Sequence, residues 1–135
     1  MRCAMRHAPM RTPLLVLVLL AVSACSPAAV DGPTIRGTVS AGPVCPVVTD
    51  PPDPACDDRP IAGAEMIVRN EAGEDVARVR SMEDGTFAIE LAPGRYQFEP
   101  QPVDGMMGTA APIEVIVAAG PDPEPITVSY DTGIR

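Results

Sequence analysis

From residue 34 onward, every apolar run is short and ends near a turn-forming residue. The chain contains 17 prolines and 11 glycines, residue types that interrupt helices and the interiors of sheets. No stretch after residue 25 shows a sustained 3.6-residue period, whereas several segments alternate apolar and polar residues as half-buried strands do. The sequence therefore predicts one all-β sandwich domain of about seven strands. The expected strand segments are 34–39, 61–69, 75–81, 86–91, 95–99, 113–117 and 126–130.

Alternation within these segments predicts which side chains face the core. Tyr96 and Phe98 are expected to point inward from one strand, and Phe87 from the strand before it. The chain has two Phe, two Tyr and no Trp, so the core should be mostly aliphatic. In the second segment one face should carry Ala64, Met66 and Val68, and the other Glu65, Ile67 and Arg69.

The N-terminus has the pattern of an export signal. Three arginines precede an apolar run over residues 14–22, which is shorter than the roughly 20 residues of a membrane-spanning helix. The run ends in Val22-Ser23-Ala24-Cys25, which resembles the lipobox of bacterial lipoproteins. The resemblance implies a helical signal peptide over residues 1–24, and a diacylglyceryl group and further acylation, such as palmitate, on Cys25. The alternative is an ordinary signal that is cleaved elsewhere, with Cys25 incidental.

Processing at Cys25 would change both the cellular location of the chain and the set of charged and catalytic side chains that it retains. Several acyl chains would hold the protein on the extracytoplasmic side of a cell membrane, with residues 25–33 as a tether. The processed chain keeps seven arginines and eighteen acidic residues, a net charge of −11. Its acidity makes nucleic acid an unfavourable partner. The only histidine, His7, lies in the signal, and the chain has no lysine.

Four cysteines reduce to one expected disulfide. Cys3 leaves with the signal and Cys25 carries the lipid, so Cys45 and Cys56 remain in an oxidising compartment. The loop between them is rich in proline and aspartate and is neither helix nor central strand. A redox or metal pair and two unpaired thiols are the alternatives. The spacing is not Cys-x-x-Cys and no histidine remains for a zinc site, so a structural disulfide is the prediction.

Four motifs occur in order along the chain: Gly37-Thr38-Val39, then residues 60–66 (PIAGAEM), 81–87 (SMEDGTF) and 91–96 (LAPGRY). Together they resemble the carboxypeptidase regulatory-like domain, a relative of the collagen-adhesin B-type repeats and of the transthyretin-like fold. The resemblance implies an antiparallel, Ig-like or transthyretin-like β-sandwich over residues 34–130, with residues 131–135 as a C-terminal tail. Two features depart from the family pattern: Ser81-Met82 replaces Thr-Asp, and the cystine loop interrupts the first connection.

The resemblance also assigns roles to single residues. Gly63 would let the chain turn into a strand, and Asp84-Gly85 would make a hairpin. Phe87 and Tyr96 would be core aromatics on adjacent strands that meet across the sheet, with Pro93-Gly94 as the turn between them. A zinc peptidase domain is not part of the resemblance, and the isopeptide bonds of some adhesin repeats need a lysine that this chain lacks.

Two groups of residues are candidates for ligand chemistry. Carboxylates near the cystine loop could bind calcium, or they could form a solvated acidic surface; these are Asp50, Asp53, Asp57 and Asp58. Met106 and Met107 could form a partner-binding patch, bind copper as thioethers, or pack within a loop. Nucleophilic catalysis would need an activating base, which a chain without histidine or lysine supplies poorly.

The sequence hypothesis for function is a lipid-anchored, extracytoplasmic, non-catalytic β-sandwich that serves as a binding or structural module of the cell envelope. Its partner would be an envelope protein or a carbohydrate. The alternative is a calcium-stabilised accessory or ligand-sensing lipoprotein, and an enzyme comes third.

Overall fold

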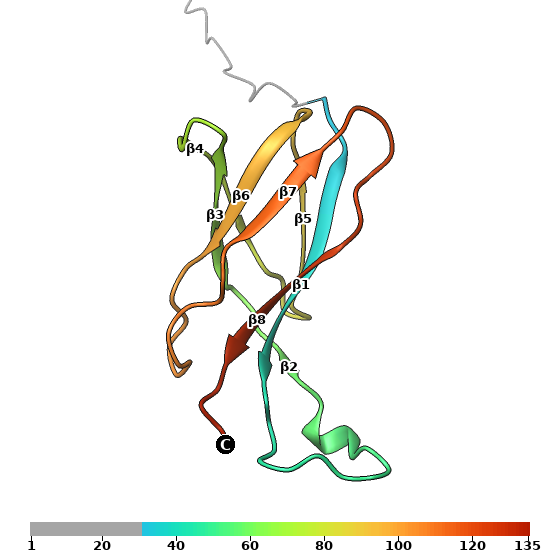
Figure 1. Ribbon diagram of the computed structural model, residues 1–135, viewed down its shortest axis with the longest axis vertical. Helices are drawn as coiled ribbons and strands as arrows, with labels where there is room; N and C mark the ends of the chain where they lie inside the picture. Colours follow the sequence, from blue (N-terminus) through green and yellow to red (C-terminus); the bar gives the residue numbers. More distant parts are fainter. Residues whose placement is uncertain (1–30) are drawn as a thin grey trace, which may run out of the picture.

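The computed structural model describes residues 31–135, which form two packed β-sheets (Figure 1). The predicted all-β sandwich is therefore confirmed, and both Cys25 and the signal lie outside the described residues. Within residues 31–135, no helix is long and apolar enough to cross a membrane. The elements are β1 (Thr34–Gly42), the 3-10 turn η1 (Pro54–Cys56), β2 (Arg59–Pro60), β3 (Glu65–Asn70), β4 (Asp75–Arg80), β5 (Thr86–Glu90), β6 (Gly94–Pro100), β7 (Ile113–Val117) and β8 (Ile126–Asp131).

Sheet A is built around β1. On one side of β1, β5 and then β2 pair antiparallel with it, and on the other side β8 pairs with it in parallel from Gly37↔Ile126 to Gly42↔Asp131. The fully antiparallel arrangement expected from the resemblance is thus wrong at this pair. After β7, residues 118–125 cross to sheet A at the end where β1 begins, and the Thr34 amide donates to Asp122 Oδ1 at 2.8 Å. Since β8 enters sheet A at the end where β1 begins, it must run in the same direction.

Sheet B has the strand order β4-β3-β6-β7 and is antiparallel throughout. Its predicted inner face is confirmed, because Ala64, Met66 and Val68 are all buried. Ile67 points to the outer face as predicted, yet it is only 9% exposed. Its cross-strand neighbours are Arg78 and Glu99, and long charged side chains of this kind cover apolar surface with their stems.

The core lies between the two sheets and is mostly aliphatic, as the composition predicts. Phe98 is fully buried on β6 and lies 6.3 Å from the Phe87 ring, measured between centroids. Tyr130 is 1% exposed, and its hydroxyl donates to the Gln101 carbonyl at 2.6 Å. Burial in an apolar environment raises the pKa of this tyrosine.

Two expected neighbour relations are wrong, because both turns cross between the sheets. Phe87 lies on β5 in sheet A, whereas Tyr96 lies on β6 in sheet B, so they do not meet across one sheet. Phe98 is the aromatic partner of Phe87, and half-buried Tyr96 donates its hydroxyl to the Ala92 carbonyl at 2.8 Å. The Pro93-Gly94 turn makes this crossing from sheet A to sheet B.

The Asp84-Gly85 turn likewise joins β4 in sheet B to β5 in sheet A and is not a hairpin. Gly85 has φ +77°, and its carbonyl accepts from the Val39 amide at 2.8 Å. A side chain at this position would meet the Val39 carbonyl oxygen, so the turn packs directly against β1. Asp84 accepts from the hydroxyl and the amide of Thr86, and these bonds lower the pKa of its carboxyl.

Ser81 fastens the end of β4 to the chain that leads into β3. Its hydroxyl donates to the Ile61 carbonyl at 2.6 Å and accepts from the Ala64 amide at 3.0 Å, while its own carbonyl accepts from the Gly63 amide at 2.9 Å. Gly63 has φ +71°, a conformation that disfavours residues with a side chain. The hydroxyl is therefore the feature that this position requires.

We predict that Ser81→Ala lowers the free energy of unfolding by about 1–3 kcal/mol, because it leaves two buried backbone groups without their partner. Ser81→Thr keeps the hydroxyl and should lose less. Ser129→Ala, at an exposed serine of β8, is the matched control. Urea unfolding measures all three variants, and equal stability of Ser81→Ala and Ser129→Ala would contradict the assignment.

Candidate binding site at the cystine-loop end

An apolar cavity of about 520 Å³ opens at the end of the sandwich that carries the cystine loop. Three segments that are distant in sequence surround it: residues 41–62, residues 103–106 and the C-terminal residues 132–134. The volume falls in the range of small-ligand and peptide side-chain pockets. Eight of its lining residues are apolar and three are polar: Ala41, Val44, Pro60, Ile61, Ala62, Val103, Met106 and Ile134, with Arg59, Asp104 and Thr132.

Hydrogen bonds hold these three segments together. The Thr132 amide donates to the Gly42 carbonyl at 3.1 Å, and its hydroxyl donates to the Pro43 carbonyl at 2.5 Å. The Met107 amide donates to the Asp131 carbonyl at 2.7 Å. The wall of the cavity is therefore fixed to both β1 and β8.

The disulfide Cys45–Cys56 is present, as predicted, with the two Cα atoms 5.2 Å apart. Inside the loop, Asp53 caps the short turn η1 by accepting from the Ala55 amide at 2.9 Å. The bridge lies one residue beyond Val44, which lines the cavity. Closing the loop therefore also restrains one wall of the site.

The candidate calcium ligands are not brought together. Among residues 31–135, no group of three or more acidic, cysteine or histidine side chains lies close enough to hold a metal ion. Asp53 is engaged in capping, and the Asp58 carboxylate lies against the backbone of Gly42. The acidic side chains Asp50, Asp53, Asp57 and Asp58 are all exposed, which is the arrangement of a solvated acidic surface.

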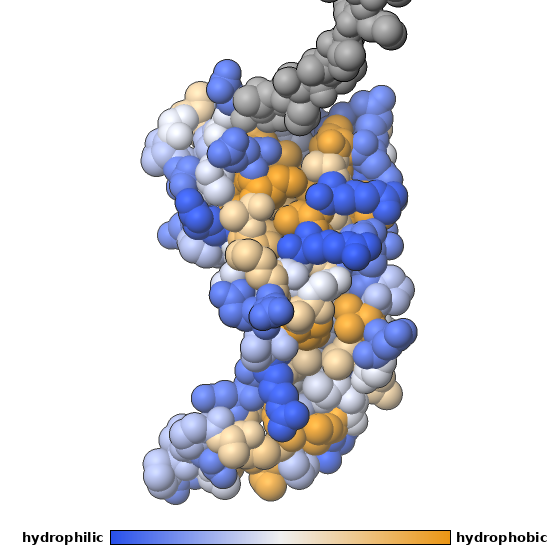
Figure 2. All heavy atoms as spheres, turned by 180° about the vertical axis from the view of Figure 1, so that it is seen from behind, coloured by the Kyte–Doolittle hydropathy of each residue, from blue (hydrophilic) through white to orange (hydrophobic). Residues whose placement is uncertain are grey.

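Apolar side chains are exposed at the same end of the molecule. Figure 2 shows apolar groups at the lower end of the molecule, beside the hydrophilic cystine loop. Met106 lines the cavity and Met107 packs its sulfur against Gly133. Of the seven large apolar side chains exposed within the described part, four belong to this end: Val47 (70%), Val48 (95%), Met107 (63%) and Ile134.

Sequence reasoning identified the two methionines as a possible patch but missed the rest of the cavity. Val44, Val103 and Ile134 each lie in an irregular segment with no periodicity that assigns a face. The pairing of β1 with β8 brings the segments of Val44 and Ile134 together, and the Met107–Asp131 backbone bond joins the segment of Val103 to them. The sequence indicated the cavity only through one apolar residue in each of three irregular segments, and this feature alone predicts a cavity poorly.

Asp131 is the most perturbed acid at this end. Arg135 Nη2 lies 2.8 Å from Asp131 Oδ2, and the Gly133 amide donates to Asp131 Oδ1 at 2.7 Å. The guanidinium first and the amide second lower the pKa of the Asp131 carboxyl to about 2. The same contact raises the pKa of Arg135, and it folds the last residues back toward β8.

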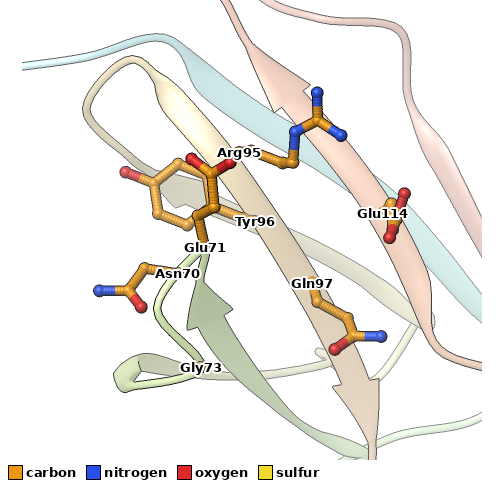
Figure 3. Close-up of a pocket in the computed structure, with 7 residues that line it drawn as sticks. All are labelled: Asn70, Glu71, Gly73, Arg95, Tyr96, Gln97 and Glu114. Atoms are coloured by element: carbon orange, nitrogen blue, oxygen red, sulfur yellow. The ribbon is translucent and has the colours of Figure 1, made fainter.

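A second pocket, of about 290 Å³, lies where the β3–β4 turn meets β6 and β7. Figure 3 shows that Arg95, Gln97 and Glu114 point in different directions rather than toward one another. The side-chain oxygen Oδ1 of Asn70 already accepts from the amides of Ala72 and Glu74. This pocket therefore offers few convergent free groups, and the cystine-loop cavity is the better candidate.

Comparisons with known proteins support the fold alone. No protein-family model matches the chain, and no curated protein matches it. Among solved structures, the shaft pilin SpaA from Lactobacillus rhamnosus GG matches with TM-score 0.56 and 9% identity over 73% of this chain and 49% of its own. The minor pilin GBS52 from Streptococcus agalactiae matches with TM-score 0.53 and 15% identity over 74% and 44%.

The TIE protein of Bacillus anthracis matches with TM-score 0.50 and 14% identity over 73% of this chain and 17% of its own. The chain thus spans about half or less of the solved chains that it resembles. These likenesses establish a pilin-like Ig sandwich. The narrower carboxypeptidase regulatory-like assignment stays a prediction.

Removing the disulfide should destabilise the fold and loosen the cavity wall. The bridge closes a loop with a sequence separation of 11, for which chain-entropy arguments give about 3 kcal/mol; prolines in the loop reduce this value. We expect Cys45→Ala/Cys56→Ala to lower the melting temperature, and a reductant to lower that of the wild type but not of the variant. Identical melting of oxidised and reduced wild-type protein would contradict this.

Acid should destabilise the C-terminal segment in a predictable window. Because the folded pKa of Asp131 is about 2 and an unfolded aspartate titrates near 3.9, ionised Asp131 stabilises the fold above about pH 4. This stabilisation is lost as the pH falls toward 2. Arg135→Ala removes the first cause of the shift, so the Asp131 pKa should rise. Carboxyl-detected NMR titration measures the pKa, and an unchanged midpoint in Arg135→Ala would contradict the assignment.

Proposed function

We propose that this chain is a lipid-anchored, extracytoplasmic β-sandwich module that presents its cystine-loop end to a binding partner in the cell envelope. The observation that carries the proposal is the placement of the apolar cavity at the far end of β1 from the tether. The likeness to pilins supports a cell-surface role. The anchor itself rests on the lipobox-like residues that end at Cys25.

β1 separates the two ends of the module. It begins at Thr34, directly after the expected tether, and ends at Gly42, next to the cavity residue Ala41. Nine extended residues span roughly 30 Å. Figure 1 shows the described N-terminal end and the cystine loop at opposite ends of the molecule. A tether on one end would therefore direct the cavity away from the membrane.

The chemistry of the cavity supports binding rather than catalysis. Its three polar lining residues are Arg59, Asp104 and Thr132, and the described chain contains no histidine or lysine to activate the threonine hydroxyl. Apolar walls with a few polar groups are typical of binding pockets. The calcium alternative has no specific observation in its favour, because the acidic side chains of the loop do not converge.

The anchor can be tested in cells. We expect Cys25→Ser to move the protein from the membrane fraction to the soluble extracytoplasmic fraction, because the acylated thiol is removed. Ser26→Ala leaves the thiol in place and should stay with the membrane. Fractionation with immunoblotting measures both, and labelling with a fatty-acid analogue should be lost only in Cys25→Ser. Membrane retention of Cys25→Ser would refute lipid anchoring.

A further inference from the structure

We infer that the cystine-loop cavity binds a cationic segment of a partner protein by taking up one of its apolar side chains. This inference rests on the proposed function, because it names the class of partner that the exposed end would meet. Two independent features of the site carry it. One is the shape and apolar lining of the cavity, and the other is the charge around its mouth.

The cavity has a lining suited to a branched or aromatic side chain. Among the lining residues Ile61 is buried, whereas Val44, Val103 and Met106 are half-buried. The exposed Ile134 forms part of the rim. A methionine in the wall can adapt to partners of different shape. Filling the cavity with an apolar group would remove this surface from water, which is the dominant favourable term in most association.

The charged residues beside the cavity favour a cationic partner over an anionic one. The segments that surround the cavity carry five aspartates and one arginine, and the adjoining Asp131 and Arg135 pair with each other. A cationic segment would meet complementary charge beside the cavity, whereas an anionic segment would be repelled. Asp104 and Arg59 line the cavity itself. Asp53, Asp57 and Asp58 line a separate pocket in the neighbouring cystine loop, where Asp50 is also exposed.

Arg59 is compatible with a peptide. It is exposed at the cavity edge and forms no ion pair among the described residues. Its guanidinium carries only hydrogen-bond donors, so it can bind backbone carbonyl oxygens of a segment whose side chains are basic. An acidic peptide would satisfy Arg59 alone and would be repelled by the surrounding carboxylates.

The test uses labelled peptide amides and the full chain in phosphatidylcholine nanodiscs, with fluorescence anisotropy as the readout. One peptide has a single leucine flanked by lysines, a second replaces leucine with serine, and a third replaces the lysines with glutamates. We expect the leucine–lysine peptide to bind. The other two should bind at least about tenfold more weakly, since one loses the apolar anchor and the other the charge match. Binding should weaken with added salt.

Two tryptophan variants locate the site. Ala62→Trp fills the cavity from an exposed lining residue and should weaken binding of the leucine–lysine peptide by about tenfold or more. Ala72→Trp places the same ring on an exposed alanine of the β3–β4 turn, at the opposite end, and should leave binding unchanged. Ile134→Ser removes part of the apolar rim without adding bulk, and it should also weaken binding. It replaces Ala62→Trp in the test if that variant does not fold.

The outcomes separate this inference from the proposed function. It is overturned if no peptide binds, if the serine or glutamate peptide binds as well as the leucine–lysine peptide, or if Ala72→Trp weakens binding as much as Ala62→Trp. Binding to empty nanodiscs would assign the signal to lipid and would also overturn it. None of these results touches the anchor, which Cys25→Ser tests separately. Recovery of the wild-type protein in the soluble fraction would refute the proposed function even if the peptide binds.

Discussion

The parallel pairing of the first strand with the last is the interaction on which the rest of the structure depends. β1 is the central strand of sheet A, because β2, β5 and β8 all pair with it. The pairing with β8 also places residues 132–134 beside the base of the cystine loop, where Thr132 bonds to the Gly42 and Pro43 carbonyls. Pairing two strands that are far apart in the sequence closes a long loop and therefore has a high entropy cost. The cavity depends on this pairing, so it forms only when the whole domain is folded.

Charged side chains are arranged differently on the outer face of sheet B and around the cavity. On the outer face of sheet B six ionic side chains form pairs: Glu65 accepts from Arg78 and Arg80, and Arg69 contacts both Asp75 and Glu99. The bond from Arg80 is the main reason that the pKa of Glu65 is lowered. Around the cavity, acids outnumber arginines. Exposed pairs contribute little stability, but each one cancels charge locally on this outer face.

The arrangement gives a physical basis for a tethered binding module. A short polar tether would connect to the start of β1, and the rigid sandwich would hold the cavity roughly 30 Å away at its other end. The disulfide and the hydrogen bonds of Thr132 restrain two walls in advance of binding. A preorganised site loses less conformational entropy when a partner binds.

Seven of the eight strands, their inward faces and the disulfide could be predicted from the sequence, because alternation and cysteine number are local signals. Met66 and Val68 were assigned to the core correctly for this reason. β2 was missed, since two residues are too few to show alternation. Sheet membership was not readable: the turns at Asp84-Gly85 and Pro93-Gly94 look like hairpin turns, yet both cross between sheets. Local turn chemistry fixes a reversal of the chain but not the strand that lies beyond it. The parallel β1–β8 pair and the cavity were decided by the tertiary structure alone, since both depend on contacts between residues about 90 positions apart.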